Sequence, residues 1–185
     1  MKRAVHHHVF PTTLGACGVA WSERGLAALQ LPEADREATE RRLAARSASA
    51  GPADPPHMVA TLIADVQHYL AGDRIDFSGA AVDLDGVEPV RCSIYQALRA
   101  IGYGHTATYG ELAHAAGLAG AEAARDVGVA MARNPVPLVI PCHRVLAAGG
   151  KLGGFSAYGG ALTKEKLLAL EGVHFDGGAP RLPGL

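Results

Sequence analysis

The first thirty residues alternate short apolar runs with glycines and polar residues, a spacing typical of short β-strands. The apolar runs at 15–21 and 25–29 flank a polar turn at 22–25, and this arrangement predicts a β-hairpin. Residues 33–46 are instead rich in alanine, glutamate and arginine, a composition that predicts an exposed helix. The pattern therefore changes from strands to helix within the first quarter of the chain.

A second helix is expected after the loop at 47–56, which contains three prolines. Asp54 is placed to cap this helix, and Pro55 suits its first turn. Gly72 ends the helix, whose apolar face repeats at helical spacing through Met58, Leu62, Val66 and Tyr69. We expect residues 1–86 to form a small α/β domain.

Residues 87–185 have a mainly helical pattern and form the second expected domain. One helix ends near Gly102 and has an apolar face made of Ile94, Tyr95 and Leu98. Two shorter helices, at 110–116 and 122–133, are separated by a break that contains glycine. This layout is that of a helix-turn-helix, whose second helix enters a groove of DNA. An ordinary helical hairpin has the same pattern and is the more common structure.

The composition is that of an ordinary folded protein. Of 185 residues, 49% are hydrophobic and 19% are charged, which supplies enough apolar surface for a core and excludes disorder for most of the chain. The formal net charge is -1, so the chain lacks the strongly basic character of proteins that bind nucleic acid by charge alone. No apolar stretch reaches the ~18 residues of a membrane helix.

Three cysteines, Cys17, Cys92 and Cys142, are too few and too scattered for a disulfide framework. Residues 1–3 lead into a run of histidines and not into the apolar core of a secretory signal. We therefore expect reduced thiols and a cytoplasmic protein that does not bind membranes.

The adjacent pair Cys142 and His143 is the strongest chemical signal in the sequence. The pair follows the apolar run 138–140, and Arg144 comes directly after it. A thiol beside a histidine can act as nucleophile and base, and neighbouring cations favour the thiolate. The alternative is that Cys142 is a small buried apolar residue, which is the commoner fate of a free cysteine. Spacing alone favours neither.

The motifs around this pair carry a family resemblance. The run Pro-Cys-His-Arg-Val at 141–145 is preceded by Asn-Pro-Val-Pro at 134–137 and followed by Gly-Gly at 159–160 and Leu-Leu-Ala-Leu-Glu-Gly at 167–172. Together they resemble the methylated-DNA–protein-cysteine methyltransferases, also called O6-alkylguanine-DNA alkyltransferases. The resemblance is dense from about residue 87 to residue 172 and looser before it.

The resemblance implies a ribonuclease-H-like α/β domain followed by a winged-helix-like domain that binds the minor groove of DNA. It also implies a protein that is consumed by its reaction, because an alkyl group moves from O6 of guanine to a cysteine and is not released. The implied partner is double-stranded DNA carrying O6-alkylguanine, acted on by a monomer. The target nucleotide must leave the duplex, because its O6 is out of reach inside the base stack.

Four residues match the family's catalytic positions. Cys142 is the implied nucleophile, and His143 is the implied base, acting through a water. Glu171 resembles the carboxylate that orients this histidine, although the residue alone would be read as a solvated charge at a helix end. Asn134 resembles the asparagine that organises the active-site turn and water. Thr163 is the expected cap of the last helix, which places Glu171 near that helix's end.

Three further residues are expected to contact DNA. Arg125 resembles the arginine that enters the duplex where the flipped base had been, and Tyr109 resembles the tyrosine that promotes rotation of the nucleotide. Arg144, beside the nucleophile, is the third expected contact. Without the resemblance, Arg125 would be read as a surface charge and Tyr109 as half-buried packing.

One segment departs from the family pattern. The stretch 154–160 carries two more residues than usual between the aromatic position and the Gly-Gly pair. Phe155 and Ser156, or else Tyr158, can occupy the place of the residues that contact the base. If Phe155 takes that place, a side-chain hydrogen bond to guanine is lost, because phenylalanine has no hydroxyl.

No cofactor or metal is expected. The transfer needs none. Some members of the family carry a structural zinc in the first domain, but Cys17 is the only cysteine there. The run His6, His7 and His8 could bind a metal.

Three other functions remain open from the sequence. A non-catalytic alkyltransferase-like protein would bind damaged DNA and recruit repair factors, but that class replaces the nucleophile, typically with tryptophan. A helix-turn-helix regulator would leave Asn134, His143 and Glu171 unexplained. A cysteine hydrolase would leave Arg125 and the helix pair unexplained.

Overall fold

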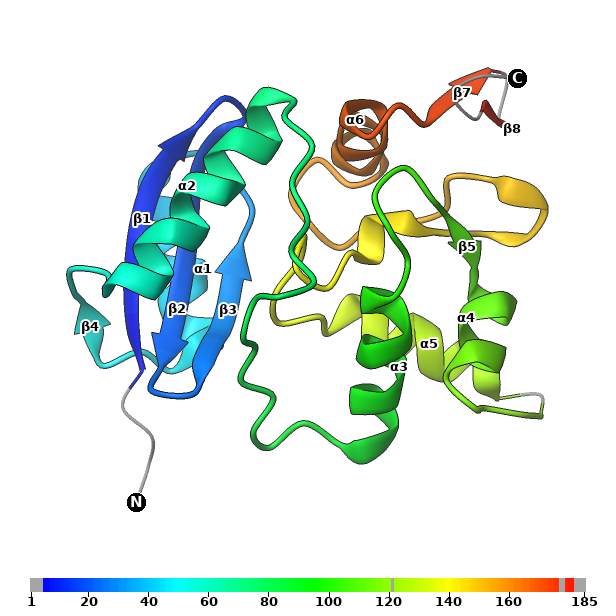
Figure 1. Ribbon diagram of the computed structural model, residues 1–185, viewed down its shortest axis with the longest axis horizontal. Helices are drawn as coiled ribbons and strands as arrows, with labels where there is room; N and C mark the ends of the chain where they lie inside the picture. Colours follow the sequence, from blue (N-terminus) through cyan, green and yellow to red (C-terminus); the bar gives the residue numbers. More distant parts are fainter. Residues whose placement is uncertain (1–4, 121, 177–178, 182–185) are drawn as a thin grey trace. The chain divides into compact units, whose positions relative to one another are not determined.

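The computed structural model describes residues 5–120, 122–176 and 179–181, so the predicted absence of a secretory signal at residues 1–3 lies outside it. The chain forms two compact units (Figure 1). The first contains residues 1–85 together with 135–137, and the second contains 86–134 together with 138–185. The short segment 135–137 was not expected in the first unit. It is held there in part by the Leu29 N–H, which donates to the Pro135 carbonyl at 2.9 Å.

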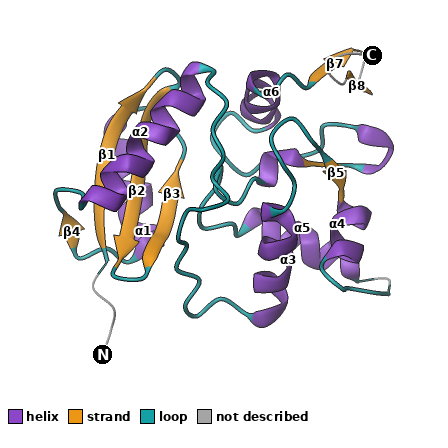
Figure 2. Cartoon of the chain, viewed as in Figure 1, coloured by secondary structure: helices purple, strands orange, loops and turns teal. Residues whose placement is uncertain are grey.

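The first unit is built on a four-stranded sheet with the order β3-β2-β1-β4 (Figure 2). Strands β2 and β3 form the antiparallel hairpin that the turn at 22–25 predicted. Strands β1 and β2 also pair antiparallel, whereas β4 joins the edge of β1 in parallel. The strands are β1 (His6–Thr12), β2 (Gly15–Ser22), β3 (Gly25–Gln30) and β4 (Gly51–Pro52).

One helix covers each face of this sheet. Successive side chains of a strand point to opposite faces, and one face packs Val9, Ala20 and Ala28 against Leu43 of α1 (Arg36–Ser47). Figure 1 shows α2 (His57–Ala71) in front of the sheet and α1 behind it. Because side chains alternate along the strands, each face of the sheet presents an apolar surface to one helix.

The caps of these helices differ in part from expectation. Gly72 ends α2 as predicted, with φ at +107°, a conformation that glycine adopts without a steric penalty. The predicted cap Asp54 is wrong, because α2 begins at His57 after Pro56, and Pro56 offers no side-chain hydrogen bond. Two successive prolines keep the backbone extended, which delays the helix beyond the reach of Asp54.

The second unit is mainly helical. Tyr95 on its first helix is buried, and its hydroxyl donates to the Ala130 carbonyl of α5 at 3.0 Å. Thr108 and Glu111 form a reciprocal cap at the start of α4. The elements are α3 (Pro89–Arg99), β5 (Ala107–Thr108), α4 (Tyr109–Ala115), α5 (Ala123–Ala132), η1 (Cys142–Arg144), β6 (Val145–Leu146), η2 (Ala148–Gly150), α6 (Ala161–Leu170), β7 (His174–Asp176) and β8 (Ala179–Arg181).

The last helix begins earlier than predicted. Helix α6 starts at Ala161 directly after Gly160, so Thr163 lies inside its first turn and is not its cap. The Thr163 hydroxyl instead donates to the Tyr158 carbonyl at 2.6 Å. Glu171 does follow the helix's last residue, as expected.

Candidate active site

A tight turn presents Cys142. The side-chain amide of Asn134 donates to the Ile140 carbonyl at 2.7 Å, and the Cys142 N–H donates to the same carbonyl at 2.8 Å. Between them Leu138 has φ at +73°, a left-handed conformation that costs a non-glycine residue on the order of 1 kcal/mol and is retained where the surroundings enforce it. Leu138 and the two residues after it are buried, and their packing holds this conformation. Asn134 therefore fixes the turn that carries the thiol.

The Cys142 side chain forms part of the wall of a cavity of about 220 Å³. The residue is only 6% exposed, so a reactant reaches the thiol through this cavity. The lining residues come from four segments of the second unit: Tyr109, Gly128, Met131, Ala132, Cys142, Gly154, Phe155 and Ser156.

Next to the cavity, one buried carboxylate holds three parts of the chain together. The Nε2 atom of His143 lies 2.9 Å from Oε1 of Glu171. Arg144 donates to the same carboxylate from Nε at 3.0 Å and from Nη2 at 2.8 Å. The Gly104 N–H donates to its other oxygen at 3.1 Å. Glu171 is only 3% exposed and is therefore not the solvated charge that its helix-end position suggested.

The protonation states of His143 and Glu171 follow from their burial and from the hydrogen bonds that Glu171 makes with His143 and Arg144. Burial opposes the charge of Glu171, but hydrogen bonds and charge from His143 and Arg144 outweigh it and hold the pKa of Glu171 below its usual range. Burial lowers the pKa of His143, against the opposing influence of Glu171. A neutral His143 beside an ionised Glu171 keeps its proton on Nε2 and its basic lone pair on Nδ1. The imidazole is thus oriented and ready to accept a proton.

Lys164 is a part of the site that was not predicted from the sequence. Its side chain is buried, and Nζ donates to the Val145 carbonyl at 2.5 Å and to the Gly154 carbonyl at 3.5 Å. Burial lowers the pKa of Lys164 to about 8, and a thiolate at Cys142 acts in the opposite direction. Its position three residues before Leu167, on the buried face of α6, was the available signal.

The residues expected to contact DNA occupy different environments. Tyr109 begins α4 and lines the cavity, whereas Arg125 projects from α5 with its side chain 78% exposed, 3.3 Å from Glu122. Arg144 is 7% exposed, and besides Glu171 it binds the Ile101 carbonyl at 2.5 Å. We therefore correct the expectation for Arg144: a contact with DNA would require it to abandon the carboxylate that it neutralises.

The two aromatic residues of the segment 154–160 have different environments. Phe155 and Ser156 line the cavity, whereas Tyr158 is 55% exposed and does not. Two glycines allow the chain to fold back, since Gly159 and Gly160 have φ at +82° and +54°. Of the two arrangements left open by the sequence, the structure has the one with Phe155 and Ser156 at the cavity.

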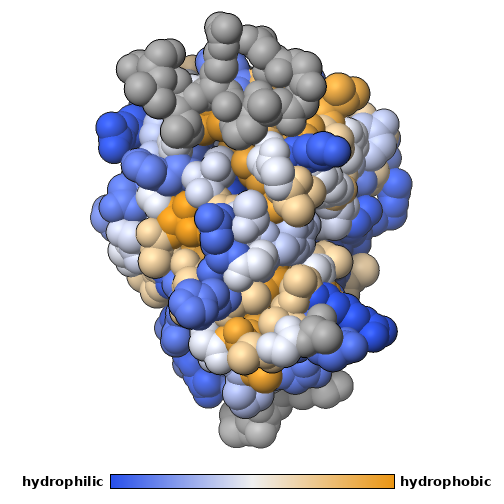
Figure 3. All heavy atoms as spheres, turned by 90° about the vertical axis from the view of Figure 1, so that its right-hand side faces the viewer, coloured by the Kyte–Doolittle hydropathy of each residue, from blue (hydrophilic) through white to orange (hydrophobic). Residues whose placement is uncertain are grey.

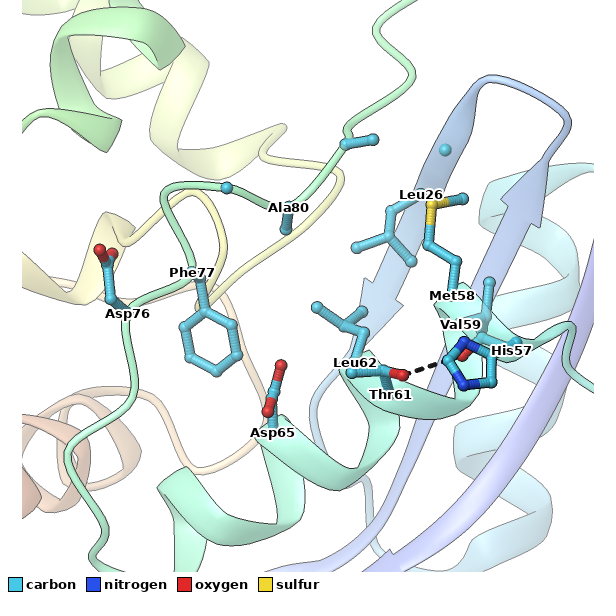
Figure 4. Close-up of a pocket in the computed structure, with 13 residues that line it drawn as sticks. Leu26, His57, Met58, Val59, Thr61, Leu62, Asp65, Asp76, Phe77 and Ala80 are labelled. Carbon is cyan, nitrogen blue, oxygen red and sulfur yellow. Dashed lines mark hydrogen bonds between the residues drawn. The ribbon is translucent and has the colours of Figure 1, made fainter.

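A larger cavity of about 500 Å³ lies in the first unit (Figure 4). Figure 4 shows Asp65 and Asp76 at one end of it, beside Phe77, and His57 with Met58 at the other. No cysteine is among its lining residues, so the smaller cavity, which contains the thiol, is the candidate active site. In the described part of the chain, no group of histidine, cysteine, aspartate or glutamate residues is arranged to hold a metal ion.

Known proteins are similar to the chain over both the site and the fold. The family described as "6-O-methylguanine DNA methyltransferase, DNA binding domain" matches residues 89–173. The methylated-DNA–protein-cysteine methyltransferase of Methanothermobacter thermautotrophicus is 32% identical over 160 residues, which are 86% of this chain and 81% of the relative. A DNA base-flipping protein of Thermus thermophilus is 41% identical over 108 residues, 58% of this chain and 69% of the relative. A crystal structure of Mycobacterium tuberculosis OGT in complex with DNA aligns with a TM-score of 0.71 at 32% identity, covering 90% of this chain and 92% of that one.

Proposed function

The chain belongs to the methylated-DNA–protein-cysteine methyltransferase family, and we propose that it repairs double-stranded DNA by moving an alkyl group from O6 of guanine to Sγ of Cys142. The observation that carries this proposal is the position of Cys142 in the wall of a cavity, directly before a buried His143 that is paired with Glu171 at 2.9 Å. A nucleophile, an oriented base and a carboxylate are the parts that a thiol needs for activation.

The proposed transfer is a single displacement. The Cys142 thiol gives its proton to Nδ1 of His143 through a water, and the thiolate attacks the alkyl carbon. A sulfur–carbon bond forms while the carbon–oxygen bond breaks, and the electron pair of that bond stays on the guanine. The proton that His143 took from the thiol then passes through water to N1 of guanine, so the product is neutral guanine and His143 is again neutral. Burial and the nearby thiolate raise the pKa of Tyr109, so its hydroxyl keeps its proton and can donate a hydrogen bond to the departing base. No cofactor takes part.

DNA is the proposed partner, and extrusion of the nucleotide is part of the proposal. Cys142 lies within a cavity, so the base must leave the stack to meet it. Arg125 is the exposed cation that we propose for the space left in the duplex. Figure 3 shows a face on which hydrophilic and hydrophobic side chains are mixed. The formal net charge of the chain is -1, so it has no overall excess of cations for binding DNA. Binding therefore rests on shape and specific contacts more than on a basic surface.

The other functions weighed from the sequence fit the site less well. A non-catalytic damage-binding protein has no use for a cavity thiol beside a His–Glu pair, and the presence of Cys142 favours catalysis. A regulator would need the α4–α5 pair but not this network. For a hydrolase, α4 and the exposed Arg125 have no role.

The state of the protein in the cell is also a proposal. One chain supplies the thiol, the base, the carboxylate and the cavity, which supports a monomer. Its three cysteines are not joined in disulfides, which supports a reducing compartment such as the cytoplasm. Within the described residues, no helix has both the length and the apolar character needed to cross a membrane.

The test is intact-mass analysis after mixing the protein with a duplex that contains O6-methylguanine. We expect the addition of a single methyl group, and peptide mapping should place it on Cys142 and not on Cys17 or Cys92. Cys142→Ala should abolish transfer and still bind the methylated duplex. Repeated turnover, or methylation of another cysteine, would contradict the proposal, and tight binding without any mass change would favour the non-catalytic alternative.

A further inference from the structure

We propose that Tyr158 is a DNA-contacting residue that grips the strand carrying the extruded nucleotide, and that the two-residue insertion at 154–160 serves to present it. This inference rests on the proposed function, because it requires DNA at the mouth of the Cys142 cavity. It concerns positioning of the substrate and assigns Tyr158 no part in the chemistry.

Both ends of the segment are tied to helix α6. The buried ammonium of Lys164 donates to the Gly154 carbonyl at 3.5 Å, and the Thr163 hydroxyl donates to the Tyr158 carbonyl at 2.6 Å. The Gly160 N–H closes a turn on the Ala157 carbonyl at 2.9 Å. A side chain at position 159 would collide with Thr163, since an added Cβ would lie 2.5 Å from its hydroxyl. The backbone at Tyr158 is therefore fixed before any partner arrives.

The side chain of Tyr158, by contrast, is left in solvent. It is 55% exposed and is the only aromatic residue among the exposed large hydrophobic side chains of the described chain. A tyrosine side chain has only two side-chain torsions and so loses little conformational entropy when it binds, which is why tyrosine is favoured at recognition surfaces.

The position of the segment indicates what the ring meets. Gly154, Phe155 and Ser156 form part of the cavity wall, and Tyr158 follows two residues later in the same turn. A base that enters this cavity remains joined to its neighbours, so the sugars and phosphates next to it must pass beside the segment. Tyrosine suits this partner because its hydroxyl donates to phosphate oxygens and its ring packs on sugars and bases. Such a contact also supplies affinity that a chain of net charge -1 does not obtain from cations.

The experiment compares two substrates in the full-length protein. Transfer is measured from an O6-methylguanine duplex and from a free O6-alkylguanine base, for wild type, Tyr158→Ala and Tyr158→Phe. We expect Tyr158→Ala to lose about tenfold in second-order rate with the duplex and in affinity for it, the effect of one good aromatic contact. With the free base its rate should stay within about twofold of wild type. Tyr158→Phe should keep part of the duplex rate, because it keeps the ring.

Val90→Ala is the matched control, because Val90 is an exposed apolar side chain of the same unit on another helix. Equal duplex rates for Tyr158→Ala and wild type would overturn the proposal and leave the proposed function intact. An equal loss on duplex and free base would also overturn it, by showing that Tyr158 shapes the cavity. Failure of the wild type with both substrates would instead refute the proposed function.

Discussion

Glu171 accepts hydrogen bonds from three residues, Gly104, His143 and Arg144, while almost completely buried. Removing its charge leaves Arg144 buried without a counter-ion, which costs roughly 3 kcal/mol in comparable cases. It also removes the anion that keeps the His143 imidazole basic. The residue therefore couples the strength of the base to the stability of the second unit.

We predict that Glu171→Gln lowers the rate of methyl transfer by ~10²-fold, the lower range for loss of general-base assistance. The pH at which Cys142 becomes reactive should rise, because His143 becomes a weaker proton acceptor. A pH–rate profile with duplex substrate measures both effects. Glu165→Gln, an exposed carboxylate of the same helix, should behave as wild type. An unaltered profile in Glu171→Gln would reduce this carboxylate to a structural role.

The same carboxylate gives a prediction for stability in acid. Because the pKa of Glu171 is lower in the folded protein than in the unfolded chain, its contribution is fully present above the ordinary carboxyl pKa of ~4.3 and is lost as the pH falls below it. Urea unfolding of wild type and Glu171→Gln should differ most near neutral pH and converge in acid. A constant difference down to pH ~2 would contradict this linkage.

Residue by residue, the sequence located the site better than it explained it. The pair Cys142 and His143 could be found because its members are adjacent. Glu171 was recognised only through family resemblance, since a charge at a helix end is usually solvated. Its burial depends on Arg144, whose role no local pattern reveals. The burial of Lys164 could not be predicted from the sequence, because its partners are the backbone carbonyls of Val145 and Gly154, which only the folded chain brings near it.

At the scale of elements, most helices and strands could be predicted, but their ends could not. The hairpin at 22–25 and the break after Gly72 follow from local turn and glycine chemistry. The starts of α2 and α6 did not, because proline pairs and a glycine with positive φ shift them away from the nearest polar cap. The sequence predicted that two short helices, α4 and α5, follow each other across a glycine-containing break. That they bind DNA is a proposal.

Arg125 tests that use of α5. Replacing Arg125 by Ala should slow transfer from duplex DNA by about tenfold or more, since nothing then fills the space of the extruded base. Transfer from a free O6-alkylguanine base should be nearly unchanged, because that substrate needs no extrusion. Single-turnover kinetics on both substrates measure the difference. Lys166→Ala removes the same charge from an exposed site on α6 and serves as control; equal losses on the two substrates would assign Arg125 to folding or to chemistry.

At the scale of the whole molecule, the product of the reaction differs electrostatically from the starting protein. Methylation converts the Cys142 thiol, which can ionise, into a thioether, which cannot, and ionised Cys142 is an influence that raises the pKa of Lys164. Once Cys142 can no longer ionise, this influence is lost, while burial continues to lower the pKa of Lys164. We therefore expect the buried ammonium to be less stable in the methylated protein near neutral pH, where its hydrogen bonds to the Val145 and Gly154 carbonyls remain.

We predict that the methylated protein unfolds at a lower temperature than the unmethylated one, by about 2–4 °C for each kcal/mol lost. The difference should shrink above pH ~8, where Lys164 is neutral in both forms. Thermal unfolding before and after stoichiometric methylation measures it, and in Lys164→Met the difference should be smaller. A shift of equal size in that variant would mean that crowding by the methyl group, and not charge, is responsible.

Because of the buried Lys164, the stability of each molecule is expected to depend on whether Cys142 has already accepted an alkyl group. Alkylated and unreacted molecules have the same sequence and fold. With the predicted difference in stability, they spend different fractions of time unfolded. A protease that cuts only unfolded chains therefore removes the alkylated molecules first, in proportion to that difference in stability. We therefore expect the alkyl group that inactivates the protein also to shorten its lifetime wherever such a protease is present.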